Sequence, residues 1–245
     1  MPELPEVETI RKQLSEKIIG KKLDGRTVTA VKRRAKILII EFADKTALLF
    51  HLKLTGQLIL NATPGKYTRR VFDLSDGSRL VFNDVRKFAW HKTVSKRELE
   101  DIEKNLGPEP FGLTEKNFAA MLAERPRAKI KPLLMDQKFI AGIGNIYADE
   151  ILFAGGIHPL RQAGTLDKKE IHSLFASIKK ILKAAVRAGG SSVKDYLDAS
   201  GKEGGFAKHH KVYQKTGQKC LECGGVIRRI RIGSRSAHFC PKCQK

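Results

Sequence analysis

Four cysteines carry the clearest chemical signal in the chain. They form two Cys-x-x-Cys pairs within the last 26 residues: Cys220, Cys223, Cys240 and Cys243. Two such pairs suit two tight turns that close one tetrahedral thiolate site around zinc. In a reducing compartment this pattern favours metal ligation over disulfides. Four thiolates fill the tetrahedron, so we expect one zinc ion with a structural role and no catalytic one.

The first residues carry a second chemical possibility. The chain begins Met1-Pro2-Glu3, and removal of Met1 would leave Pro2 with a secondary amine. An α-amino group has a pKa near ~8, so a useful fraction is nucleophilic at neutral pH. Its attack on the anomeric carbon of a sugar gives an iminium ion, which serves as an electron sink. Glu3 would supply general acid and base chemistry, whereas the alternative is a carboxylate that only favours a helix dipole.

The charge balance indicates a polyanionic partner. The chain has a formal net charge of +21, from 47 Lys and Arg against 26 Asp and Glu. Neutralising phosphates requires no particular base sequence, so charge alone leaves DNA and RNA partners open. Four arginines lie between the cysteine pairs, where a β-hairpin would hold them toward a phosphate backbone: Arg228, Arg229, Arg231 and Arg235. A solvated charged face is the alternative for these arginines.

Periodicity predicts the elements that position these residues. Helical spacing of Val7, Ile10, Leu14 and Ile18 predicts a helix from Pro5 to about Gly20. Short β runs follow to about residue 94, among them 36–42 and a hairpin that folds at residues 76–77. Residues 106–112 interrupt regular structure. Helical spacing then continues to residue 189, with Thr114 and Thr165 as expected N-caps.

These patterns predict an α+β protein. We expect an N-terminal helix and antiparallel β-sandwich domain over residues 1–106, a helical DNA-binding domain over 107–213, and a zinc finger in a β-hairpin over 214–245. No apolar run approaches the ~18 residues that span a bilayer, and the N-terminus lacks a secretory pattern. We therefore expect a cytoplasmic monomer with no membrane partner.

The opening MPELPEVETI, together with the cysteine hairpin, resembles the formamidopyrimidine-DNA glycosylase family of bacterial DNA repair. The resemblance covers nearly the whole chain. It implies a bifunctional glycosylase and AP lyase that excises oxidised purines, such as 8-oxoguanine and formamidopyrimidines, from double-stranded DNA. It also implies Pro2 as the nucleophile, assisted by Glu3 and by Glu6, followed by β,δ-elimination.

The string Arg33-Arg34-Ala35-Lys36 resembles the family's RRGK string, with Ala35 where glycine is usual. This replacement is expected to add only a methyl group. The resemblance implies that Lys36 is a catalytic residue on a β-strand and contacts the phosphate or sugar of the damaged nucleotide. A surface lysine beside a core strand is the alternative.

Residues 135–150 resemble the family's helix-two-turn-helix element. Gly142 and Gly144 would allow a tight turn that brings backbone N–H groups and a helix N-terminus close to a phosphate. The resemblance implies that Lys138 and Asn145 add side-chain contacts to the DNA backbone. A glycine pair before a helix also marks ordinary turns.

An enzyme that acts on a stacked base must extrude it and fill the gap. The family uses a methionine, an arginine and a phenylalanine for this purpose. By resemblance, Leu54 stands at the methionine position, and Arg86 and Phe88 supply the other two. The alternative is a surface arginine with a core phenylalanine.

The chain departs from the family in two places. The stretch between Gly20 and Lys36 is shorter than usual, so we expect a strand or connection of the N-terminal sandwich to be missing. Glu203 and Gly205 stand where proline and tyrosine are common, which should loosen the loop over 189–213 and leaves the lesion preference open. This segment resembles the loop that closes over the flipped base in purine-specific members of the family. Its full length argues against the endonuclease VIII branch, which prefers oxidised pyrimidines and has this loop shortened. A pyrimidine-preferring enzyme and a zinc-ribbon DNA binder without activity remain alternatives.

Overall fold

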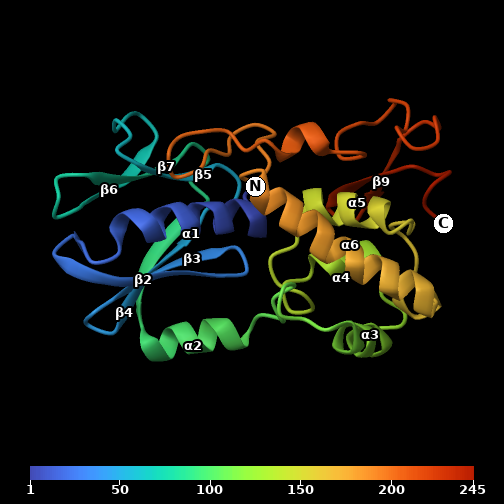
Figure 1. Ribbon diagram of the computed structural model, residues 1–245, viewed down its shortest axis with the longest axis horizontal. Helices are drawn as coiled ribbons and strands as arrows, with labels where there is room; N and C mark the ends of the chain where they lie inside the picture. Colours follow the sequence, from blue (N-terminus) through green and yellow to red (C-terminus); the bar gives the residue numbers. More distant parts are fainter. The chain divides into compact units, whose positions relative to one another are not determined.

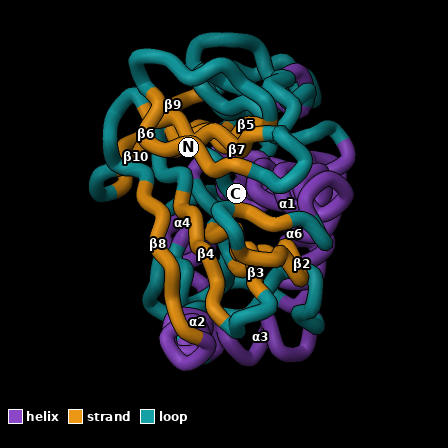
Figure 2. Tube along the Cα trace, turned by 90° about the vertical axis from the view of Figure 1, so that its left-hand side faces the viewer, coloured by secondary structure: helices purple, strands orange, loops and turns teal.

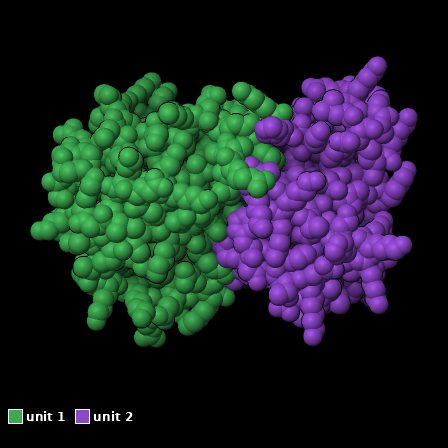
Figure 3. All heavy atoms as spheres, in the orientation of Figure 1, with its two compact units in different colours: residues 1–105, 185–208 green, residues 106–184, 209–245 purple.

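The computed structural model describes all 245 residues, which divide into two compact units (Figure 3). Unit 1 comprises residues 1–105 and 185–208, and unit 2 comprises 106–184 and 209–245. The segment 185–208, predicted to be part of the helical domain, thus belongs with the N-terminal residues. The division into three domains stays a prediction. None of the helices is both long and apolar enough to cross a membrane.

Two antiparallel sheets form the frame of unit 1. One has the strand order β1-β2-β3-β4-β8 and the other the order β5-β7-β6; β2, β3, β4 and β8 can be followed in Figure 2. The strands are β1 (Lys22–Leu23), β2 (Arg26–Arg34), β3 (Ile37–Phe42), β4 (Thr46–His51), β5 (Gly56–Leu60), β6 (Thr68–Asp73), β7 (Arg79–Asp84) and β8 (Trp90–Ser95).

Helix α1 (Leu4–Ile18) begins with a capping box in which the side chains of Glu3 and Glu6 bind each other's backbone N–H. Its apolar stripe is fully buried and packs into one core with residues of both sheets. Figure 1 shows α1 alongside β2 and β3. Helix α2 (Lys96–Lys104) packs Leu99 into a second cluster with β3 and β4. The predicted N-terminal helix, the antiparallel sheets and the hairpin near residue 77 are confirmed.

Unit 2 holds four helices and one hairpin. They are α3 (Glu115–Ala123), α4 (Ile130–Met135), α5 (Asn145–Ala154) and most of α6 (Lys168–Arg187), with β9 (Arg228–Ile232) paired to β10 (Arg235–Phe239). Short 3₁₀ turns, η1 (Ala163–Thr165) and η2 (Phe206–His209), lie before and after α6.

The two expected N-caps have different outcomes. Thr114 caps α3, since its side chain accepts from Asn117 N. The prediction for Thr165 was wrong, because Thr165 lies in η1 and its hydroxyl donates to the Gln162 carbonyl. Asp167 takes its place: its carboxylate accepts from Glu170 N at 2.8 Å, and the Glu170 carboxylate accepts from Asp167 N at 2.9 Å.

Candidate functional site

The N-terminal residues of the chain are buried in unit 1. Pro2 is buried, and Glu3 and Glu6 are each only 1% exposed. The Glu6 carboxylate accepts hydrogen bonds from Glu3 N at 2.7 Å and from Ser191 N at 2.8 Å. Glu6 therefore fixes the backbone beside Pro2 and ties it to a segment 185 residues away. With Met1 attached, the Pro2 nitrogen is part of a peptide bond, so its amine chemistry requires the loss of Met1.

The segment after α6 closes around this N-terminus through its backbone. The Tyr196 hydroxyl donates to the Gly189 carbonyl at 3.1 Å, and burial, with the nearby charges of Glu6 and Asp198, raises the pKa of Tyr196. A Cβ on Gly204 would lie 2.4 Å from the Gly190 carbonyl oxygen, so only glycine fits there. Gly205 N donates to the Ala188 carbonyl at 2.8 Å. The backbone hydrogen bond thus fixes the position of Gly205, which has no side chain to do so.

Lys36 lies in the two-residue turn between β2 and β3. The expectation that it lies on a strand was wrong. It is 7% exposed. Arg33 fixes the turn, because its guanidinium donates to the Ala35 carbonyl at 2.8 Å and to the Glu8 carboxylate of α1 at 3.0 Å. The positioning role of Arg33 has no signal in the sequence, since its partner on α1 is set only by the fold.

Ala35 adopts a φ of +54° in this turn. This is the left-handed region, which favours glycine and costs other residues roughly 1–2 kcal/mol. The expectation that alanine adds only a methyl group was therefore wrong. Glycine is usual at this position in the family because it adopts a positive φ without strain. In this chain Ala35 adopts that conformation with backbone strain.

The histidine opposite this turn stays uncharged at neutral pH. His51 pairs in register with Ile37, the residue after Lys36. Burial, together with the charges of Lys53 and Lys36, lowers the pKa of His51 to about 4. The imidazole therefore adds no positive charge beside the turn at neutral pH, where the positive charges are those of the lysines and of the two arginines that precede the turn.

Two loops of unit 1 meet at the buried carboxylate of Asp84, which is 1% exposed. The Thr55 hydroxyl donates to Asp84 Oδ1, Arg86 N lies 3.3 Å from Asp84 Oδ1, and Ala89 N donates to Oδ2 at 2.8 Å. One side chain thus joins the turn over 52–56 to the loop over 85–89. Sequence reasoning missed this role; the acid directly before the exposed loop was the only signal.

The three predicted duplex-filling residues lie on these two loops. Leu54 is half-buried in the first loop, and Arg86 and Phe88 are exposed in the second. Phe88 is 55% exposed, and the Arg86 guanidinium lies 5.2 Å from its ring centroid. Phe88 is therefore no core residue, and its exposure beside a cation suits contact with a partner.

A rigid loop precedes α5 in unit 2. The Gln137 side chain donates to the Ile143 carbonyl at 2.8 Å and accepts from Gly142 N at 2.9 Å, and Gly142 has a φ of +93°. Lys138 is exposed on this loop. The N-cap of α5 is Gly144, which has no side chain to cap the helix, and Asn145 follows. Such a helix start can bind an anion such as a phosphate.

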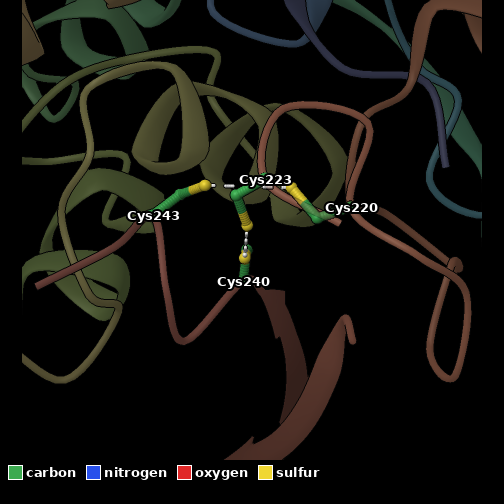
Figure 4. A group of neighbouring side chains, drawn as sticks. All are labelled: Cys220, Cys223, Cys240 and Cys243. Atoms are coloured by element: carbon green, nitrogen blue, oxygen red, sulfur yellow. Dashed lines mark hydrogen bonds between the residues drawn. The ribbon is translucent and has the colours of Figure 1, made fainter. Parts of the chain in front are cut away.

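The four cysteine sulfur atoms form one compact group (Figure 4). They lie within 4.8 Å of one another, and the pairs Cys220–Cys243 and Cys223–Cys240 are 3.8 and 3.4 Å apart. A tetrahedral zinc site with Zn–S bonds of about 2.3 Å needs sulfur separations of about 3.8 Å. Burial and the neighbouring thiols raise the pKa of Cys243, so crowding disfavours a lone thiolate and a cation relieves it. The residues fit one structural zinc ion.

Arg235 is exposed at the start of β10, and Arg228, Arg229 and Arg231 are exposed on β9. The turn between these strands places Gly233 at a φ of +59°. The predicted hairpin is present and exposes these guanidinium groups to solvent, which fits both a phosphate contact and a solvated charged face.

Three family descriptions match the chain in succession. Residues 19–91 match the formamidopyrimidine-DNA glycosylase N-terminal domain, residues 106–196 the formamidopyrimidine-DNA glycosylase H2TH domain, and residues 217–245 the zinc finger found in FPG and IleRS. Together they cover both units.

Relatives and solved structures match over the full length. The formamidopyrimidine-DNA glycosylases of Listeria innocua and Herpetosiphon aurantiacus are 40% and 38% identical, over 100% of this chain and of each relative. The Lactococcus lactis Fpg in complex with abasic-site DNA has a TM-score of 0.91 at 35% identity and covers 99% of both chains. MutM in complex with DNA that contains carbocyclic 8-oxo-G has a TM-score of 0.91 at 36% identity over 100% of both chains.

Proposed function

Because the chain belongs to the formamidopyrimidine-DNA glycosylase family and is a DNA glycosylase, we propose that it excises oxidised purines from double-stranded DNA and then cleaves the sugar. The single observation that carries this proposal is the Glu6 carboxylate, which holds the backbone beside Pro2 at Glu3 N and Ser191 N. Glu6 completes the capping box of α1, and its second bond, to Ser191 N, goes beyond capping and holds the terminal residue still. Structures of relatives with 8-oxo-G and Fapy-dG DNA support the choice of lesion.

The proposed chemistry begins at the amine that the loss of Met1 releases. The Pro2 nitrogen bonds to C1′ while the glycosidic bond breaks, the base leaves with the bond's electron pair and takes up a proton, and the amine loses its proton. Protonation of the ring oxygen by Glu3 opens the sugar and leaves a C1′ iminium. Glu3 is suited to this role because it is buried at the residue that follows Pro2.

Strand cleavage follows from the same intermediate. The iminium makes the C2′ proton acidic, so removal of this proton expels the 3′ phosphate. Removal of the C4′ proton from the resulting unsaturated iminium then expels the 5′ phosphate. Water then hydrolyses the iminium and returns Pro2 as an amine. Lys36, buried in a turn that Arg33 fixes, would hold the phosphate or sugar of the damaged nucleotide in place.

The DNA contacts are divided between the two units. In unit 1, Leu54, Arg86 and Phe88 would fill the gap that the extruded base leaves. In unit 2, Lys138 and Asn145 would bind phosphates at the start of α5, and Arg235 would bind them from the zinc hairpin. The proposed partner is duplex DNA with a damaged base, bound by a monomer.

Borohydride trapping tests the role of Pro2. We expect the mature chain, with Met1 loss verified by intact mass, to form a covalent complex with 8-oxoguanine DNA. Pro2→Gly, or a tag that blocks the terminus, should abolish this complex. Pro64→Gly, in an exposed loop, is the matched control and should trap normally. Trapping by the blocked protein would refute the terminal amine as the nucleophile.

A lesion panel separates the remaining alternatives. Cleavage of 8-oxoguanine and formamidopyrimidine duplexes above thymine glycol duplexes is the expected result. The reverse order would assign the chain to pyrimidine lesions. A gel shift without any cleavage would leave only a zinc-stabilised DNA binder.

A further inference from the structure

Three buried side chains in unit 2 have no part in the chemistry proposed above. Lys131 of α4, Asp149 of α5 and His238 of β10 are 1%, 1% and 7% exposed. Asp149 Oδ1 lies 2.7 Å from Lys131 Nζ, and Asp149 Oδ2 accepts from His238 N at 3.0 Å and lies 2.9 Å from His238 Nδ1. Lys131 Nζ also donates to the Ser236 carbonyl. We call these three residues the Asp149 cluster.

The Asp149 cluster binds one edge of strand β10. The other edge of β10 pairs with β9. The Ser236 carbonyl and His238 N–H therefore belong to an edge that would otherwise lack partners, and helices α4 and α5 supply them through Lys131 and Asp149. Each of these bonds is made to a particular backbone atom, so the cluster sets the position of β10 along the helices.

Apolar packing alone would not set this position. Phe153 of α5, Val212, Ile227 and two of the cysteines form a core beneath the zinc site, and such contacts attract without direction. A buried ion pair adds little net stability over apolar residues of the same size. Directed hydrogen bonds instead select a single register of β10. A slip of one residue would turn every side chain of this strand to the other face.

The Asp149 cluster also connects two proposed DNA contacts. Asp149 lies four residues after Asn145, about one helical turn along α5. Arg235 directly precedes Ser236, whose carbonyl Lys131 binds. We propose that Asp149 is a positioning residue, which fixes the span between the phosphate contacts at Asn145 and Arg235. This inference rests on the proposed function for its DNA readout.

A double-mutant cycle with Arg235 tests the positioning role. The Kd for duplex DNA with a tetrahydrofuran abasic analogue is measured at several salt concentrations for wild type, Asp149→Asn, Arg235→Ala and the double variant. We expect Arg235→Ala to weaken binding and to lower the salt slope by about 1. Asp149→Asn should weaken binding when Arg235 is present, and have little effect when it is absent. Glu170→Gln, which breaks the partly exposed pair with Arg161, is the control.

Two further measurements keep folding and function apart. Lys131→Met/Asp149→Asn removes both charges, leaves an amide that can accept from His238 N, and should show the same DNA defect with one zinc retained. Hydrogen exchange at the β10 amides should become faster in both Asp149 variants, whatever Arg235 does.

The outcomes distinguish the positioning role of Asp149 from the proposed phosphate contact of Arg235. Equal losses of affinity with and without Arg235, or unchanged β10 exchange in Asp149→Asn, would overturn the positioning role. An Arg235→Ala variant that binds normally would instead overturn the proposed phosphate contact, and the exchange data would still decide whether Asp149 positions β10.

Discussion

The zinc site and the N-terminal site differ in how the chain brings their residues together. The sulfur atoms come from two local turns, each closed within four residues of sequence. The N-terminal site depends on a distant pair, because Glu6 binds Ser191 N across 185 residues. The two loops of unit 1 depend on another, because Thr55 binds Asp84 across 29 residues. Local spacing is visible in a sequence, whereas a hydrogen bond between distant segments exists only once the backbone has folded.

The two regions also use charge differently. The N-terminal site buries the carboxylates Glu3 and Glu6, which are 1% exposed, while the hairpin of unit 2 exposes its arginines. Buried ionisable groups suit proton transfer, and exposed cations suit a screened phosphate backbone. The first region should therefore control the rate of the reaction, and the second the affinity for DNA.

Glu3→Gln should give the largest effect on the rate. The amide keeps the size of the side chain but cannot transfer a proton, so single-turnover excision of 8-oxoguanine should fall about 10²- to 10⁴-fold. The Kd for abasic-analogue DNA should not change. Glu16→Gln, exposed on the same helix, is the control. Loss of affinity without loss of rate would reverse the assignment of the two regions.

Cys240→Ser should weaken DNA binding more than it lowers the excision rate, the reverse of the effect expected for Glu3→Gln. Removal of one ligand opens the zinc site, whose binding energy contributes directly to folding of the hairpin. Zinc content should fall below one ion per chain, and DNA binding should weaken at least about tenfold, or 1.4 kcal/mol. At saturating DNA the excision rate should fall less than the affinity does. Ser234→Ala, exposed in the hairpin turn, should retain zinc. A zinc-free variant with normal affinity would contradict the proposed role of Arg235.

The zinc site and several elements of the fold could be predicted from the sequence, because neighbouring residues determine them. The cysteine spacing, the helical stripe from Val7 to Ile18 and the turn at Gly77 are each set by neighbours, and all are present. The sequence predicts a strand at Lys36, because the apolar run Ile37–Ile40 gives no sign of the turn before it. Asp84 and Arg33 were missed since their partners, Thr55 and Glu8, are distant in sequence.

Acid should destabilise both units through their histidines, and most strongly through one buried histidine in each. Burial, with nearby positive charge, lowers the pKa of His51 in unit 1 and of His210 in unit 2 to about 4. The unfolded imidazoles take up protons near pH 6.5, so the folded state loses stability as the pH falls from about 6.5 toward 4. His51→Gln and His210→Gln should each flatten the dependence of Tm on pH in this range. A slope equal to that of the wild type in both variants would contradict these shifts.

Ala35→Gly should give the smallest effect, because two opposing contributions nearly cancel. Glycine relieves the left-handed strain at φ +54°, worth roughly 1–2 kcal/mol. It also removes a methyl group that is 2% exposed, worth about 0.8 kcal/mol, and adds about 0.4–1 kcal/mol of unfolded-state entropy. The free energy of unfolding should therefore change by less than about 1 kcal/mol, as thermal unfolding can measure. Ala35→Val has no such compensation, since a β-branched residue fits the left-handed region poorly, and should be clearly less stable. If glycine instead raised Tm by more than about 4 °C, the buried methyl would contribute nothing and the alanine would be strain alone.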